Sequence, residues 1–124
     1  EHVENLIHLA ETVLQPVRDH FGKAVVISSG YRSPALCEAI GSSAKSQHAR
    51  GEAADFEIPG VDNKELATWI SKNCNFDQLI LEFYNESDPN SGWVHCSATA
   101  SEPRGQCLSA TKVQGRTKYE QIIL

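Results

Sequence analysis

The chain begins with apolar residues that recur every three or four positions across residues 2–21. This spacing puts their side chains on one stripe and predicts an amphipathic helix that packs on a core. Because Pro16 removes one backbone donor, it should kink the helix near its end, and Gly22 is expected to stop it. The stripe consists of Val3, Leu6, Ile7, Ala10, Val13, Leu14, Val17 and Phe21.

Later apolar runs are short and predict strands rather than helices. Residues 24–29 are rich in β-branched side chains, and we expect a buried strand there. Residues 53–58 alternate small or apolar side chains with acidic ones. Residues 76–83 hold three aliphatic residues in a row, which indicates burial on both faces. Residues 93–98 form the returning strand, after a connection rich in turn-forming residues.

A second main helix is predicted over residues 64–73, capped by Asp62 or Asn63. Between the first two strands we expect a short helix over 35–40 and then a long polar loop over 41–51. The tail predicts either a final β pair, over 107–113 and 119–124, or a strand followed by a loose end. The sum is one α+β domain, residues 1–124, with two main helices on a small, mainly antiparallel sheet.

Composition excludes several classes of protein. At 124 residues the chain is long enough for one core and too short for two. Its net charge of -5 argues against nucleic acid as a partner, which would favour a basic face. No apolar run approaches the roughly 20 residues that span a bilayer. The sequence opens on Glu1 rather than Met, so a targeting segment could lie upstream of it.

The four cysteines are Cys37, Cys74, Cys96 and Cys107. None forms a C-x-x-C pair, which argues against a structural zinc site made of cysteines. Four cysteines allow three disulfide pairings, and the sequence selects none of them. Because Cys74 and Cys96 have apolar neighbours, we expect most of the four to be free, partly buried thiols.

Two histidines and an aspartate have the residue types of a catalytic zinc site. Such sites hold zinc by three protein ligands, drawn from His nitrogens and carboxylate oxygens, and keep one position for water. His48 and Asp55 flank a stretch of small residues that includes Gly51, so a loop could fold back beside the strand it feeds. His95, from the strand 93–98, could supply the third ligand.

A hydrolase also needs a base beside the water that zinc activates. Glu82 ends a predicted strand, where antiparallel pairing could bring it near His95, and Glu86 in the following loop is the competitor. Arg32, in a turn, could hold a substrate carboxylate in a bidentate pair. Residue types alone leave a plainer alternative open, in which these are ordinary surface or strand-end polar groups without a metal.

Three motifs in order resemble the zinc D-Ala-D-Ala carboxypeptidase family, which includes peptidoglycan-cleaving peptidases of bacteria and phage endolysins. They are Ser29-Gly30-Tyr31-Arg32-Ser33-Pro34, Ser46-x-His48-x-x-Gly51-x-Ala53-x-Asp55 and Trp93-Val94-His95. The resemblance implies that His48, Asp55 and His95 are zinc ligands. It implies that Arg32 receives a carboxylate or another backbone oxygen of the substrate, and that Ser46 lines the site.

The chain departs from this pattern at the catalytic glutamate. Several family members place it three residues before the last histidine, and here that position is Gly92. The related zinc domain of hedgehog signalling proteins is a better match: Phe76-Asp77, then Glu82, with His95-Cys96-Ser97, resemble its glutamate-bearing strand and last ligand. That likeness implies Glu82 as the base.

The resemblance therefore implies a monomeric zinc peptidase that cuts the peptidoglycan stem peptide, in the periplasm or cell wall or encoded by a phage. A second hypothesis is a zinc-bearing binding module with little hydrolytic activity. A third is a structural domain without metal. The sequence leaves open which peptide bond would be cut.

Overall fold

The computed structural model describes residues 2–29, 51–99 and 103–124. The helix predicted over 35–40 and nearly all of the polar loop over 41–51 lie outside these residues. None of the helices in the described ranges is long and apolar enough to cross a membrane.

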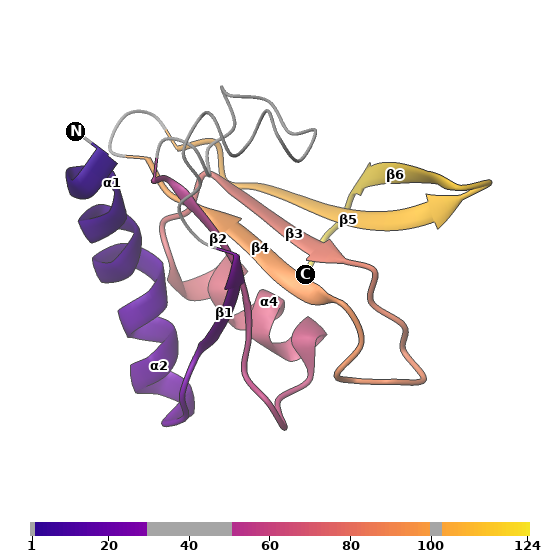
Figure 1. The fold of residues 1–124 in the computed structure, drawn as a ribbon, viewed down its shortest axis with the longest axis horizontal. Coiled ribbons are helices and arrows are strands. Elements are labelled where there is room, and N and C mark those ends of the chain that lie inside the picture. The colour runs from indigo at the N-terminus through magenta and orange to yellow at the C-terminus, as the bar shows by residue number, and fades with distance from the viewer. Residues whose placement is uncertain (1, 30–50, 100–102) are drawn as a thin grey trace.

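The N-terminal helix is continuous in space but changes its hydrogen bonding midway. It comprises α1 (His2–Leu9), a π-helical turn η1 (Ala10–Leu14) and α2 (Gln15–Phe21) (Figure 1). The Gln15 N–H bonds the Ala10 carbonyl, five residues back. Pro16, which has no N–H, follows immediately, and the wider turn accommodates the missing donor. Gly22 ends the helix at φ 64°, as predicted.

Within the described residues, six strands form one mixed sheet in the order β1-β2-β4-β3-β5-β6. Every neighbouring pair is antiparallel except β3 and β5, which are parallel. The predicted mainly antiparallel α+β fold is thus confirmed. The tail forms the β hairpin, the first of its two predicted alternatives. The strands are β1 (Val26–Ser29), β2 (Ala53–Glu57), β3 (Gln78–Glu82), β4 (Trp93–Ser97), β5 (Gln106–Val113) and β6 (Arg116–Gln121).

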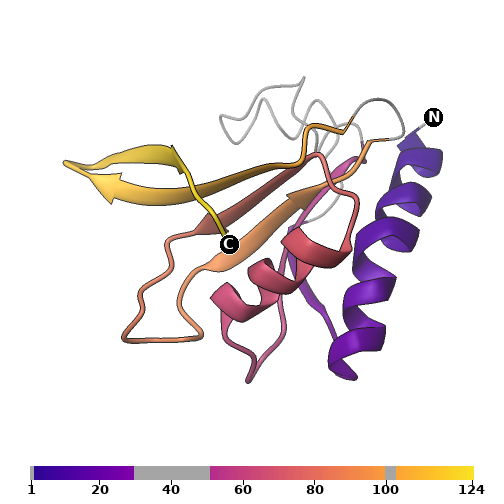
Figure 2. The ribbon, with the colours of Figure 1, turned by 180° about the vertical axis from the view of Figure 1, so that it is seen from behind.

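The second main helix, α4 (Asn63–Asn73), begins where the sequence predicted it. Asp62 is its cap, because the Asp62 carboxylate accepts a hydrogen bond of 2.8 Å from the Lys64 N–H. Figures 1 and 2 show the N-terminal helix and α4 beside the sheet, with the β5–β6 hairpin projecting away from both.

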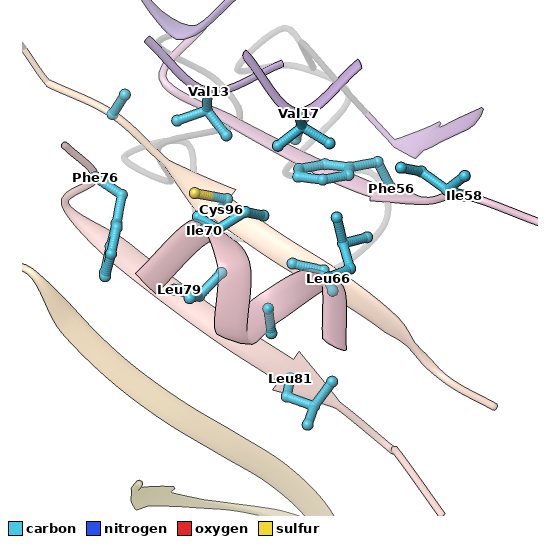
Figure 3. Packing of buried hydrophobic residues seen from close by; sticks show 14 of the residues in the cluster. Val13, Val17, Phe56, Ile58, Leu66, Ile70, Phe76, Leu79, Leu81 and Cys96 are labelled. Carbon is cyan, nitrogen blue, oxygen red and sulfur yellow. The ribbon is translucent and has the colours of Figure 1, made fainter. Parts of the chain in front are cut away.

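The core lies between these helices and one face of the sheet (Figure 3). Alternate residues of the three central strands point into it, as the period of two in a strand requires. They are Ala54, Phe56, Leu79, Leu81, Val94 and Cys96. The residues between them, including Asp55 and His95, consequently point to the opposite face, away from the helices.

The prediction of a buried strand over residues 24–29 is wrong. Val26 and Ile27 are 47% and 50% exposed. β1 lies at one edge of the sheet in the described part of the chain, so β-branched content there reflected strand propensity and not burial. The aliphatic run in β3 is buried on both faces, as predicted, because Ile80 is only 7% exposed although it points away from the core.

Among the described residues, Cys74, Cys96 and Cys107 are free thiols, as expected. Cys96 is buried and the other two are half-buried. Cys37 lies outside the described residues.

Candidate metal centre

Strand register brings the candidate ligands together. Asp55 on β2 lies directly opposite His95 on β4. Glu82 on β3 lies opposite Trp93, two residues before His95 on the same strand. Since residues two apart in a strand share a face, all four side chains project from the face opposite the helices.

The imidazole of His95 and the carboxylate of Asp55 are in direct contact. His95 Nδ1 and Asp55 Oδ1 are 2.8 Å apart, the length of a hydrogen bond in which the ring N–H donates to the carboxylate. Their side chains are 12% and 17% exposed, so the pair is sheltered but open to a ligand. Asp55, Glu82 and His95 each offer a ligand atom within 4.8 Å of the others.

Glu82 is held by a tryptophan. The indole Nε1–H of Trp93 donates to Glu82 Oε2 at 2.6 Å, a short bond to a carboxylate. The Trp93 ring also packs on Phe83, with centroids 5.4 Å apart. These contacts orient one carboxylate oxygen of Glu82.

No side chain fits at position 92, where the family pattern leads one to expect a glutamate. The φ of Gly92 is +65°, in the left-handed region, and a Cβ built on it would lie 1.8 Å from the Glu82 carbonyl oxygen. A side chain at this site would collide with the backbone of β3. Glu82 lies close to this position, because it is the register partner of Trp93, the residue that follows Gly92.

The connection from β3 to β4 is anchored away from the centre. Asn63, 1% exposed at the start of α4, donates its side-chain amide to the Ser91 carbonyl at 2.9 Å. Glu86 extends outward, with its side chain 83% exposed and 3.6 Å from Lys64 Nζ. Of the two glutamates considered as base, Glu82 is therefore the one that lies beside Asp55 and His95.

The sequence-predicted site residues divide into two groups. Asp55, Glu82 and His95 are brought together by the sheet. His48, Arg32 and Ser46 lie outside the described residues. The hydrogen bond from Trp93 to Glu82 was not predicted. The sequence held a signal for it, because Trp93 lies two residues from His95 and Glu82 lies two residues from Ile80. Where Ile80 pairs with His95, Trp93 and Glu82 therefore share a face.

The donor set suits zinc better than a hard cation. An imidazole nitrogen with carboxylate oxygens matches the ligands that zinc takes in catalytic sites, whereas calcium and magnesium prefer oxygen alone. Two adjacent carboxylates also provide negative charge to offset that of a divalent ion, and the residues present thus fit zinc.

The family model for Peptidase M15 matches residues 2–97, which include the N-terminal helix and the strands that carry Asp55, Glu82 and His95. No curated protein matches the chain. The β5–β6 hairpin lies outside the matched residues. Because the family match covers most of the sequence, the chain belongs to the Peptidase M15 family, which is zinc-dependent and D-Ala-D-Ala carboxypeptidase-like.

Proposed function

We propose that this protein is a zinc peptidase that hydrolyses a peptide bond in the peptidoglycan stem peptide. The observation that carries the proposal is the convergence of Asp55, Glu82 and His95 on one half-buried patch of the sheet, within the part of the chain that matches a peptidase family. The partner is then a cell-wall peptide, and the site of action is the periplasm, the cell wall or phage-mediated lysis.

His48, Asp55 and His95 would hold the metal. His95 Nδ1 and Asp55 Oδ1 are 2.8 Å apart, close enough for both to hold one ion, which would displace the proton between them. The third ligand is within reach along the chain, since only two residues separate His48 from Gly51, and Asp55 lies four residues beyond Gly51. Such a tether spans at most about 3.5 Å per residue, which keeps His48 within reach of the centre. When bound, zinc supplies Lewis-acid polarisation of a carbonyl and lowers the pKa of water to about 7.

Glu82 is the proposed general base. It would take a proton from the attacking water and pass it to the leaving amine, while the Trp93 N–H keeps Oε2 fixed.

Arg32 and Ser46 are the proposed substrate residues. The family pattern assigns Arg32 to a carboxylate or backbone oxygen of the peptide, a role that suits a guanidinium with paired donors. Ser46 would line the same site. Positioning of the substrate by such groups contributes to the rate by holding the scissile bond near the base.

The test is hydrolysis of a defined disaccharide-pentapeptide muropeptide by zinc-loaded protein, with products identified by mass spectrometry. The wild type should release new amino groups, and the masses report which bond is cut. His48→Ala and Glu82→Gln should each reduce the rate at least about 100-fold. Glu86→Gln removes a neighbouring glutamate with an exposed side chain and is the matched control, so its rate should equal that of the wild type.

Equal release by wild type and His48→Ala would overturn the proposal. A zinc-bearing binding module makes a different prediction: wild type and Glu82→Gln would both bind the muropeptide, and neither would cut it. Loss of activity in Glu86→Gln with none in Glu82→Gln would move the base to the loop.

A further inference from the structure

The C-terminal hairpin, β5 and β6, extends the sheet on the side of β3 that faces away from β4. β5 pairs with β3, the strand that carries Glu82, and β6 pairs with β5. This hairpin lies outside the residues that match the peptidase family, so nothing in that match assigns a role to it. Figures 1 and 2 show it continuing the sheet outward from β3, away from both main helices.

One tyrosine of the hairpin shares a row with Glu82. Ala110 on β5 is the register partner of Glu82 on one side and of Tyr119 on the other. Directly paired residues project from the same face of a sheet, so Tyr119 lies on the face that carries Asp55 and His95. Ala110 is completely buried but is not part of the core cluster. This is expected of a small residue that lies on the face opposite the core and is covered there by larger neighbours.

Only the small side chain of Ala110 stands between Glu82 and Tyr119 in this row. Strand spacing of about 4.8 Å would separate β3 from β6 by about 10 Å in a flat sheet, and β2 from β6 by about 19 Å. Burial and the negative charges of Glu82 and Asp55 together raise the pKa of Tyr119. Tyr119 thus lies two strands from Glu82 and four strands from Asp55 in the strand order of the sheet. Tyr119 as a whole remains 55% exposed, so a ligand can reach it.

We propose that Tyr119 is a substrate-binding residue, whose hydroxyl donates a hydrogen bond to a carbonyl or carboxylate oxygen of the bound peptide on the Glu82 side of the centre. This inference rests on the proposed peptidase function. A neutral phenol donates a hydrogen bond, and a peptide carbonyl oxygen is an acceptor for it. The hairpin then makes one side of the peptide-binding surface, and the N-terminal 97 residues supply the chemistry.

The experiment compares Tyr119→Phe with wild type on the disaccharide-pentapeptide muropeptide. The substitution keeps the ring and removes only the hydroxyl. Tyr84→Phe is the matched control, because the Tyr84 hydroxyl bonds Asp62 and lies outside this row. Loss of one substrate hydrogen bond should raise KM about three- to tenfold and leave kcat within about twofold, while Tyr84→Phe leaves both unchanged. Equal melting temperatures for wild type and Tyr119→Phe would show that the effect is not structural.

A second measurement separates this inference from the proposed function. The dissociation constant of the same muropeptide is measured with zinc-loaded Glu82→Gln, alone and combined with Tyr119→Phe. A three- to tenfold weaker affinity in the combined variant supports the role of Tyr119 even if the wild type proves unable to cut the peptide. An unchanged KM and affinity overturns it, as does a lower kcat at constant KM. Absence of any binding overturns both the substrate assignment and the role of Tyr119.

Discussion

Replacing Gly92 by alanine should be far more destabilising than the same change at other left-handed glycines. The new Cβ would lie 1.8 Å from the Glu82 carbonyl oxygen and 2.8 Å from the carbonyl carbon and oxygen of Phe83. All of these are backbone atoms, so no side chain can turn aside. β3 and the start of β4 would have to separate where the candidate base is held.

The magnitude follows from two contributions. A left-handed conformation costs a residue with a Cβ about 1–2 kcal/mol. Separating β3 from β4 should also break about two of the backbone hydrogen bonds that join these strands where Glu82 pairs with Trp93. At about 1 kcal/mol each, these bring the total to about 3–4 kcal/mol. For a chain of this length, that lowers the melting temperature by about 10–15 °C.

Gly115→Ala is the matched control. Gly115 has φ +78°, and no neighbouring atom lies within 4 Å of the position that a new Cβ would take, so only the conformational cost applies. The melting temperature of Gly115→Ala should fall by about half as much or less. Thermal and urea unfolding of both variants measure the difference. Equal destabilisation at the two positions would refute the close approach of Gly92 to β3.

The remaining predictions concern the face of the sheet that carries Glu82, the binding of zinc, and the thiol of Cys74. Trp93→Phe should lower kcat about tenfold, because it removes the charge-assisted hydrogen bond to Glu82. Trp69→Phe, a change in α4, is the control and should leave kcat unchanged. Equal kcat values for the two variants would show that the indole of Trp93 does not position the base. Zinc at 100 times its dissociation constant should stabilise the fold by about 2.7 kcal/mol and so raise the melting temperature. A chelator or His95→Ala should abolish this rise. A rise that persists in His95→Ala would show that the metal binds elsewhere. Burial raises the pKa of the Cys74 thiol to about 11, so its alkylation at pH 8 should be about 100-fold slower in the folded than in the unfolded protein. The stability that this neutral thiol contributes is present below pH 9 and is lost as the pH rises toward 11, which unfolding curves across that range would detect.

Local patterns were sufficient for most of the fold. Apolar spacing predicted both main helices, because an amphipathic stripe and a helix share one period. Asp62 lay at the predicted cap, and the short apolar runs marked the three central strands. The burial of β1 was predicted wrongly because a β-branched run does not tell which strand lies at the edge of the sheet.

The candidate site depended more on register than on pattern. Sequence left Glu82 and Glu86 as competing bases, since both are close to His95 along the chain. Pairing of β3 with β4 puts Glu82 opposite Trp93, and the exposed loop carries Glu86 toward Lys64. The absence of a glutamate at position 92 was visible in the sequence. Its reason, a backbone contact with no space for a Cβ, became visible only in the folded chain.

Residue type and local spacing were enough to predict the class of the domain and to show the resemblance to zinc peptidases. They were also enough to single out His48, Asp55 and His95 as candidate ligands. These properties need no knowledge of distant contacts. The folded arrangement was required to tell which side chains share the open face of the sheet. It placed Trp93 on Glu82 and Tyr119 in the row of Glu82, because strand order and register join segments that lie far apart in the chain.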